Sequence, residues 1–400
     1  MTAGWKTVKL GELLSRTGVP VDADPSLEYG EITVRLWGKG VVERGRVSGA
    51  QVNGRRFVAR TGNFIASRID ARNGAMGLVP ESLDGALVTN DFPLFQANKE
   101  QLDLDYLGWL SKTAGFVELC LRASEGTTNR VRLKEERFLA LEIPLPPLTE
   151  QRRIVARIEE LAAQIEEARR LRNSAVIEAG ALYAKQLDAC MSPHGNGWRR
   201  ETVADLIESM DAGWSPQCDD MPASGEEWGV LKTTSIQWCD FQPRHNKRLP
   251  ETFSPRPELV VRKGDVLVTR AGPRKRVGVV AAARGDHLRL TISDKLIRLR
   301  VLNGKVDARF LEQSLCSPFS QEHLVQRKTG LADAQVNISQ KILRDTPVAY
   351  PSLPEQRRIV GELDALQLQV NTLKTLQSDT AAELDALLPA ILDRAFKGEL

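Results

Sequence analysis

Cationic side chains gather in two loops of the sequence, each just after a short apolar run. The candidate cations are Arg68 and Arg72 in one loop and Arg270, Arg274, Lys275 and Arg276 in the other. A guanidinium fork can bind a guanine edge with two hydrogen bonds, whereas an ammonium group mainly neutralises phosphate. Gly272 lies within the longer run and permits close approach of the backbone. The loops favour contact with nucleic acid, and a solvated surface loop is the alternative.

A second set of candidate residues lies shortly before two proline-rich segments. This set consists of Asn129, Arg130, Lys328 and Asn337. Amide side chains suit adenine, which offers a donor and an acceptor in the major groove, although a turn or a helix cap also explains them. Trp37 and Trp238 could stack on bases, but a tryptophan is more often a core residue.

The residue patterns of several common catalytic sites are missing. Residues 36–40 match a phosphate-binding loop poorly, because the earlier glycine and the hydroxyl that would reach magnesium are absent. No Asn/Asp-Pro-Pro-aromatic stretch of an amino-methyltransferase, no G-x-S-x-G elbow and no H-E-x-x-H motif occurs. Cys239 and His245 lack partners at useful spacing for a metal site. We therefore expect a recognition protein that is not an enzyme and carries no cofactor of its own.

Composition narrows the setting in which such a protein works. The chain has 400 residues, 42% hydrophobic and 27% charged, which is typical of folded domains. Its 55 Lys+Arg against 52 Asp+Glu give a net charge of only +3, so a polyanion must be bound by local surfaces. Five cysteines without a C-x-x-C pair favour a reducing cytoplasm. Neither a leader segment nor a membrane span is expected.

The sequence repeats itself with a period of roughly 200 residues. The hexamer Glu-Gln-Arg-Arg-Ile-Val at residues 150–155 recurs identically at residues 355–360, each time after a proline-rich approach. Two further pairs of segments align without gaps, and we expect Gly77 to correspond to Gly278. The aligned pairs are residues 5–14 with 198–207 and residues 62–68 with 264–270. A duplicated unit explains all of these matches.

Each hexamer opens a stretch whose apolar residues recur at steps of three and four, which predicts two long helices. The expected seam positions are Ile154, Ile158, Leu161, Ile165, Ala168, Ala175, Ala179 and Leu182 in the first helix and Ile359, Leu363, Leu366, Val370, Leu373, Leu384, Leu387 and Ile391 in the second. Arg172 and Gln377 interrupt the two seams at equivalent places. We expect the helices to run to about residues 189 and 396, with Pro389 bending or ending the second.

A helix of this length extends roughly 60 Å and needs a partner along its narrow seam. The chain order predicts that the two helices pair in antiparallel directions; packing of each helix on its own domain is the alternative. Short apolar runs bounded by Gly, Asp and Asn predict strands, and residues 102–122 and 307–326 predict helices. The expected strands are residues 32–34, 64–66, 87–89, 266–268, 277–280 and 296–299.

The fold class is therefore α+β: two homologous mixed α/β domains separated by a long antiparallel two-helix coiled coil with pseudo-two-fold symmetry. We place the boundaries at 1–147 for the first domain, 148–190 for the central helix, 191–348 for the second domain and 349–400 for the C-terminal helix.

Three segments in their paired order resemble the DNA specificity subunits of type I restriction-modification systems. They are residues 146–154 with their copy at 353–359, Gly-Asp-Val-Leu-Val-Thr-Arg at 264–270, and the ending Ala-Phe-Lys-Gly-Glu-Leu at 395–400. The resemblance implies two target recognition domains, each reading one half of a split site in double-stranded DNA, spaced by conserved antiparallel helices. It also implies two modification subunits that carry S-adenosylmethionine and methylate adenine, joined by restriction subunits that use ATP and Mg²⁺.

The two copies carry unlike loops, so the expected target is two unlike short sequences, bipartite and non-palindromic. Their centres would lie about 34 Å apart if both domains enter one face of the duplex. One alternative keeps the family but serves a fused methyltransferase-nuclease. The others are a coiled-coil assembly protein without DNA affinity and an enzyme, such as a nuclease, with an unrecognised site.

Overall fold

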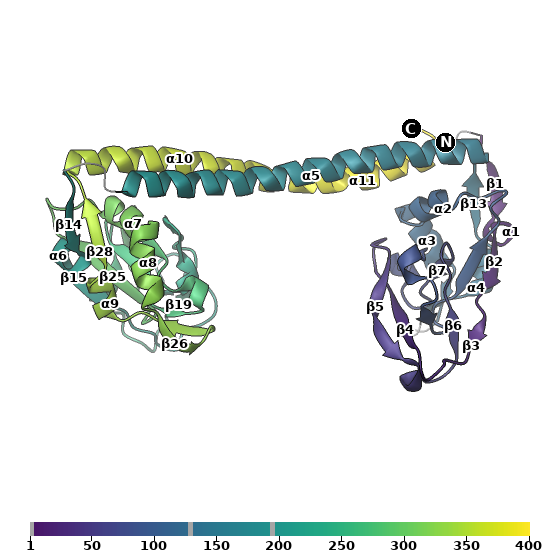
Figure 1. Ribbon diagram of the computed structural model, residues 1–400, viewed down its shortest axis with the longest axis horizontal. Helices are drawn as coiled ribbons and strands as arrows, with labels where there is room; N and C mark the ends of the chain where they lie inside the picture. The colour runs from purple at the N-terminus through teal and green to yellow at the C-terminus, as the bar shows by residue number, and fades with distance from the viewer. Residues whose placement is uncertain (1–3, 127–130, 193–196) are drawn as a thin grey trace. The chain divides into compact units, whose positions relative to one another are not determined.

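The computed structural model describes residues 4–126, 131–192 and 197–400 and groups the chain into two compact units. Unit 1 comprises residues 1–173 and 377–400, and unit 2 comprises residues 174–376. Each unit therefore holds one mixed α/β fold together with a stretch of each long helix (Figure 1). The expected α+β class is confirmed, while the division into four consecutive segments stays a prediction.

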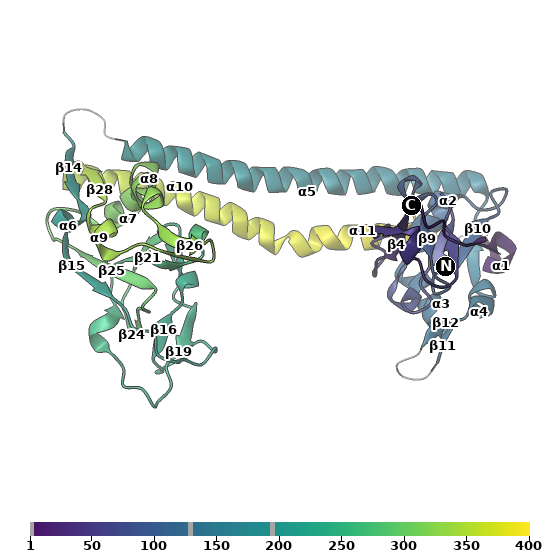
Figure 2. The same ribbon diagram turned by 60° about the horizontal axis from the view of Figure 1, so that its bottom comes forward.

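Unit 1 folds around two open sheets with strand orders β2-β10-β7-β8 and β3-β6-β9-β4-β5, beside the pairs β1-β13 and β11-β12. Figure 2 shows β11 and β12 side by side. Its strands are β1 (Lys6–Lys9), β2 (Leu14–Thr17), β3 (Pro20–Val21), β4 (Glu28–Val34), β5 (Val41–Ser48), β6 (Arg56–Val58), β7 (Phe64–Ala66), β8 (Met76–Leu78), β9 (Leu87–Val88), β10 (Leu94–Ala97), β11 (Ser124–Glu125), β12 (Arg132–Leu133) and β13 (Glu142–Leu145). Its short helices are α1 (Leu10–Leu13), α2 (Leu104–Leu110), α3 (Ala114–Arg122) and α4 (Glu135–Leu139), with 3-10 turns η1 (Gly49–Gln51), η2 (Ala71–Asn73) and η3 (Glu81–Leu83).

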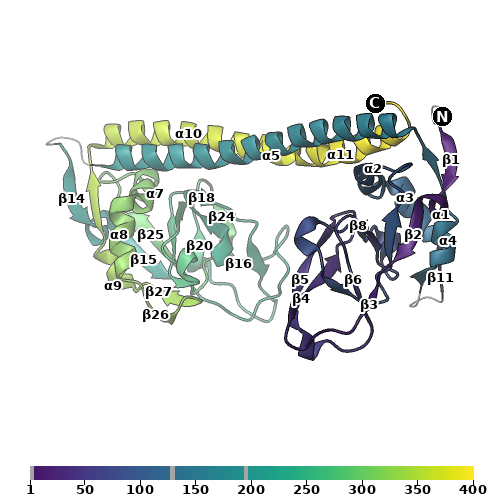
Figure 3. The same cartoon turned by 45° about the vertical axis from the view of Figure 1, so that its right-hand side comes forward.

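Unit 2 repeats this plan with sheets β15-β25-β21-β23 and β19-β16-β24-β20, the pairs β14-β28 and β17-β18, and a small sheet β22-β27-β26 that lies near α9 (Figure 3). Its strands are β14 (Arg199–Thr202), β15 (Ile207–Ala212), β16 (Gly229–Leu231), β17 (Ile236–Gln237), β18 (Asp240–Phe241), β19 (Asn246–Arg248), β20 (Val260–Val261), β21 (Val266–Thr269), β22 (Ala271–Gly272), β23 (Val280–Ala282), β24 (His287–Thr291), β25 (Leu296–Val301), β26 (Thr329–Ala332), β27 (Gln335–Asn337) and β28 (Pro347–Tyr350). Its short helices are α6 (Val203–Leu206), α7 (Ala308–Cys316), α8 (Pro318–Gln326) and α9 (Gln340–Arg344), with 3-10 turns η4 (Thr233–Ser235), η5 (Pro257–Leu259) and η6 (Arg274–Arg276).

The two folds share their strand pairing, which confirms the duplication. The antiparallel pair β1-β13 corresponds to β14-β28, and the order β2-β10-β7-β8 corresponds to β15-β25-β21-β23. Each of the predicted helical segments contains two short helices. Each of the six predicted strands overlaps an observed one, although of residues 277–280 only Val280 belongs to a strand, the first residue of β23.

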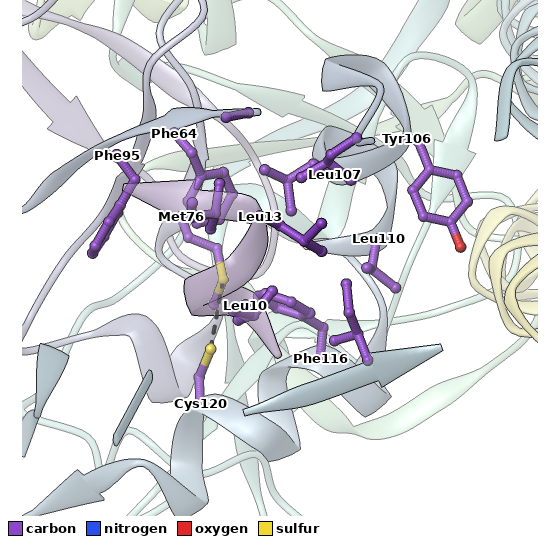
Figure 4. Packing of buried hydrophobic residues seen from close by; sticks show 14 of the residues in the cluster. Leu10, Leu13, Phe64, Met76, Phe95, Tyr106, Leu107, Leu110, Phe116 and Cys120 are labelled. Atoms are coloured by element: carbon purple, nitrogen blue, oxygen red, sulfur yellow. Dashed lines mark hydrogen bonds between the residues drawn. The ribbon is translucent and has the colours of Figure 1, made fainter. Parts of the chain in front are cut away.

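A buried aromatic cluster forms the core of unit 1 between its first sheet and α1 to α4 (Figure 4). The Phe64 and Phe138 rings stack at 6.3 Å between centroids, and Phe116 meets Phe138 edge-on at the same distance. The ring of Phe396, near the chain's C-terminus, packs on Tyr106 at 5.1 Å. The last turns of the C-terminal helix therefore belong to the core of unit 1.

The long helices are α5 (Leu148–Met191), α10 (Leu353–Asp379) and α11 (Ala381–Phe396). Pro389 lies inside α11 and does not end it, so that expectation is wrong in part. The C-terminal helix is instead interrupted at Thr380, between α10 and α11. The interruption lies three residues after Gln377, the polar residue that interrupts the series of apolar seam positions in the sequence.

Contacts within each unit show that α5 runs antiparallel to its partner. In unit 1, Arg169 pairs with Asp385 (2.8 Å), and Arg172 Nη2 donates to Thr380 Oγ1 (2.7 Å) and to the main-chain carbonyl of Gln377. In unit 2, Leu187 and Met191 at the end of α5 share a core with residues 359 and 363 near the start of α10. The two polar seam positions, Arg172 and Gln377, therefore meet. The guanidinium of Arg172 binds the carbonyl of Gln377 near the interruption of the helix at Thr380.

Most of the predicted seam residues face inward, but Leu182 and Leu387 are exposed. In their place, Tyr183 and Leu187 pack against the core of unit 2, and Leu388 and Leu392 pack against that of unit 1. An α-helix with 3.6 residues per turn drifts against a 3.5-residue repeat. Where each helix packs on the core of its unit, the line of buried residues therefore shifts by one position, from Leu182 to Tyr183 and from Leu387 to Leu388.

The repeated hexamer fixes each long helix to its α/β fold through a buried glutamine. Gln151 Nε2 donates to the carbonyls of Gln101 (2.8 Å) and Pro146 (2.9 Å), and its Oε1 accepts from the N–H of Asp103 (2.8 Å). Gln356 makes the corresponding three bonds in unit 2. The hexamer is therefore a joint between helix and domain.

Gln151→Met keeps the side-chain volume but removes the partner of the Asp103 N–H and of the carbonyls of Gln101 and Pro146, the last of these bonds being buried. We expect unit 1 to lose about 2–4 kcal/mol of stability, since each such group costs about 1–3 kcal/mol. Urea unfolding of the full chain, followed with hydrogen exchange to separate the units, measures this loss. Arg157→Met, at an exposed ion pair on α5, is the control. A loss below about 0.5 kcal/mol, the range of neutral surface changes, would contradict the assignment.

Candidate nucleic-acid interface

The candidate cations of unit 2 follow strand β21 on a turn that buried bonds hold in shape. Thr269, the last residue of β21, is buried; its hydroxyl donates to the carbonyl of Arg276 and accepts from the N–H of Val279 (3.0 Å). The carbonyl of Arg270 accepts from the N–H of Ile338 (2.9 Å). The turn η6 is thus tied to its own strand and to β27.

Arg276 is used inside unit 2. Its guanidinium donates to Gln237 Oε1 (2.9 Å) and to the carbonyls of Thr233 (2.6 Å) and Ile236 (2.7 Å). These bonds hold η4 and β17 against η6. We therefore infer an anchoring role for Arg276 within the interface.

The other cations of this turn differ in how they are held. Arg274 pairs with Asp333 (2.8 Å), whereas Lys275 is exposed and makes no hydrogen bond or ion pair with the described residues. Lys328 Nζ donates to the carbonyl of Arg274 (3.2 Å). Partial burial, and then the charge of Arg274, lower the pKa of Lys328. Lys275 is the cation most available to a phosphate.

Arg270 and Asn337 come together at the base of the same turn. Ala271 in β22 pairs with Asn337 in β27, next to the bond between Arg270 and Ile338. Arg270 Nε and Asn337 Oδ1 are both buried, and neither has a hydrogen-bond partner among the described residues. Such unpaired groups are costly in a free protein and suit a site that a ligand or water completes.

Unit 1 places Arg68 where unit 2 has Arg270. The carbonyl of Arg68 accepts from the N–H of Leu133 (2.7 Å). This bond corresponds to the one in unit 2 that the N–H of Ile338 donates to the carbonyl of Arg270. Its side chain differs, because it forms an ion pair with Glu135, which also binds Arg16 (3.0 Å). No sequence signal singled out Glu135 or Arg16, which makes them functional candidates that sequence reasoning missed.

Arg72 lies on η2, the counterpart of η6. It is half-buried and makes no hydrogen bond or ion pair with the part of the chain that the structure describes. The predicted match of Gly77 with Gly278 is wrong: Gly77 pairs with Ile65 inside the β7-β8 ladder, and the counterpart of Gly278 is Gly74. Both Gly74 and Gly278 have positive φ, which explains why glycine ends each basic turn.

Of the other candidates, Asn129 and Arg130 lie outside the described residues. The core placement expected for the two tryptophans is wrong, since Trp37 is 70% and Trp238 is 48% exposed. Each unit therefore has an exposed indole as well as a basic turn, by which we mean η2 with Arg72 in unit 1 and η6 with Arg274, Lys275 and Arg276 in unit 2.

The surroundings of Cys239 and His245 can be described as well. Within residues 4–126, 131–192 and 197–400, no group of three or more His, Cys, Asp or Glu is placed to hold a metal ion. Cys239 is buried, with Sγ against Gln313 Oε1 (3.4 Å), and His245 hydrogen-bonds Gln242 (3.0 Å). None of the described helices is long and apolar enough to cross a bilayer.

Comparison with known proteins agrees with this geometry. A family described as "Type I restriction modification DNA specificity domain" matches residues 3–174. A crystal structure of the HsdS subunit from Thermoanaerobacter tengcongensis covers 100% of this chain and 98% of its own, at 27% identity and a TM-score of 0.63. Residues 3–174 therefore belong to this DNA specificity domain family. The HsdS likeness spans both units.

Two further relatives give the same assignment. A structure described as the "structural basis underlying complex assembly and conformational transition of the type I R-M system" covers 100% of this chain and 99% of its own, at 28% identity and a TM-score of 0.74. The EcoEI specificity subunit of Escherichia coli is 38% identical over 202 residues, 49% of this chain and 34% of that protein. The chain spans less than two thirds of the length of the curated relatives it matches.

Proposed function

We propose that this specificity subunit binds a bipartite, non-palindromic site in double-stranded DNA, with each unit reading one half. The observation that carries this proposal is the repeated basic turn: η2 with Arg72 and η6 with Lys275 follow equivalent strands in the two folds. Unpaired cations on a rigid turn suit phosphate contact, and polar groups beside them suit base edges.

The two half-sites are expected to differ because the two turns differ chemically. Glu135 begins α4 and holds Arg68 and Arg16, whereas Gln340 begins α9, the corresponding helix of unit 2. A carboxylate beside one arginine and a neutral amide at the equivalent place give the turns different charge. Two unlike surfaces favour two unlike sequences.

The reactions themselves are assigned to partner subunits. Two modification subunits would carry S-adenosylmethionine and methylate adenine, and restriction subunits would use ATP and Mg²⁺, all in the cytoplasm. Exposed apolar residues lie on the helices of unit 2, Ile177 and Leu182 on α5 and Leu368 on α10, and we expect a partner to dock along these helices. A fused methyltransferase-nuclease in place of separate subunits would use the same surfaces.

Ile177→Lys with Leu182→Lys tests this docking. We expect the doubly substituted chain to fold, because both side chains face solvent, and to lose most of its bound modification subunit in a pull-down with purified partner. Leu171→Lys, a change of the same kind on α5 in unit 1, is the comparison variant. Unchanged recovery of the modification subunit would place the docking surface elsewhere.

Mapping methylated adenines in a host with and without this chain tests the proposed function. We expect one split sequence to be methylated only when the chain is present. If the purified chain cut or methylated DNA with a metal ion or methyl donor and no partner, the enzyme alternative would replace this proposal. If host methylation were independent of the chain, an assembly role without DNA would be favoured.

A further inference from the structure

Each unit exposes one tryptophan at the basic turn. Trp37 lies in the loop between β4 and β5, and Trp238 lies in the turn between β17 and β18. β4 pairs in parallel with β9, and β16, which precedes Trp238, pairs in parallel with β24, the counterpart of β9. The two indoles therefore follow equivalent strands, and a large apolar ring in solvent is unfavourable in both.

In unit 1 the backbone holds this loop on η2. The N–H of Trp37 donates to the carbonyl of Asn73 (2.8 Å), and the N–H of Gly38 donates to that of Gly74 (3.1 Å). Trp37 has a φ of 60°, which a residue with a large side chain rarely adopts. A Cβ at Gly74 would come within 3.2 Å of Gly38 N and 3.3 Å of Trp37 Cα. The loop with Trp37 therefore packs closely on η2, and Trp37 has an unfavourable backbone conformation although its ring is exposed.

In unit 2 different bonds produce the same placement. The N–H of Cys239 donates to the carbonyl of Val280 (3.0 Å), and Cys239 has a φ of 53°. The guanidinium of Arg276 binds Gln237 Oε1 and the carbonyls of Thr233 and Ile236, so it ties η6 to the hairpin. Strain next to an exposed indole thus occurs twice, although the bonds that maintain it differ.

We propose that Trp37 and Trp238 each lay the indole ring against bases of the half-site bound by their own unit. The neighbouring unpaired cations, Arg72 on η2 and Lys275 on η6, would bind the phosphates that bring the bases to the ring. In a duplex the ring can reach base edges in a groove, such as the thymine methyl, and this contact gains free energy by desolvating the ring, which the free protein leaves exposed. This inference rests on the proposed function and adds to it the side chains that contact bases.

The test measures DNA affinity of the full chain with its modification subunits, using a duplex that carries the methylated sequence and duplexes with one half-site scrambled. We expect Trp37→Ala and Trp238→Ala each to weaken binding to the intact duplex by about tenfold, while the Phe variants, which keep a large apolar ring, retain most of the affinity. The salt dependence should stay as in the wild type, because no cation is removed. Val19→Ala and Leu288→Ala, which truncate exposed apolar residues elsewhere in units 1 and 2, should bind normally.

The scrambled duplexes assign each ring to its half-site. Scrambling the half-site bound by unit 1 should lower the DNA affinity of the Trp37 variant by a smaller factor than that of the wild type. Scrambling the half-site bound by unit 2 should do the same for the Trp238 variant. Wild-type affinity and discrimination in both Ala variants would overturn the inference. Loss of modification subunit with unchanged DNA binding would also overturn it and would assign the rings to a protein partner. Failure of the wild-type assembly to bind any of these duplexes would instead reject the proposed function.

Discussion

Insertion of seven residues into both long helices is expected to abolish methylation of the native sequence and to create a new target with the same half-sites further apart. Seven residues extend a helix by about 10 Å, or about three base pairs of 3.4 Å. They also preserve the seven-residue repeat of the seam. The insertions belong after Asn173 in α5 and after Leu376 in α10, because the adjacent residues Arg172 and Gln377 are bonded to each other. Methylation mapping in a host carrying the variant gives the answer.

The same insertion in α5 alone is the matched control. It places the two antiparallel helices out of register, so we expect a poorly folded chain and no methylation at any spacing. If the doubly extended chain folds and methylates the native sequence at its native spacing, the helices do not set the distance between half-sites.

Charge reversal at Lys275 is expected to weaken DNA binding at least tenfold near physiological salt. Lys275→Glu removes one phosphate contact and adds a repulsive charge, so the slope of log affinity against log salt should fall by about one. Folding should be unaffected, since Lys275 is exposed and bonded to none of the described residues. Binding titrations at several salt concentrations measure both quantities.

Lys374→Glu, the same change at an exposed position on α10, should leave affinity and salt slope close to those of the wild type. Equal effects of the two substitutions would indicate a general charge effect. No effect of either would favour the coiled-coil assembly protein that does not bind DNA. Reversal at Arg276 would be ambiguous, because its guanidinium holds the Trp238 hairpin in place.

The repeat and the long helices could be predicted from the sequence because they rest on local periodicity. Gln151 and Gln356 mark the start of each helix in identical hexamers, and the apolar steps after them carry the helical signal. The interruption at Thr380 was visible only as a missing apolar position. Pro389 is the stronger sequence signal, yet it lies inside α11. Packing of α11 on unit 1 overrides the local preference of proline.

The details of the interface were less predictable because they depend on contacts between residues distant in sequence. Arg276 lies beside Lys275 in the cation run, but its side chain turns inward to residues 233–237. The carboxylate of Glu135 reaches Arg68 from another element, 67 positions along the chain. Trp37 is exposed and has a left-handed backbone, and residue type alone indicates neither.

Selection of bound duplexes from a random-sequence DNA pool, with this chain and its modification subunits as bait, tests the central claim most directly. The account predicts enrichment of two unlike short blocks separated by a fixed, unspecified spacer, with block centres about one helical turn apart. Enrichment of a single uninterrupted sequence, of two identical inverted blocks, or of no sequence at all would contradict it.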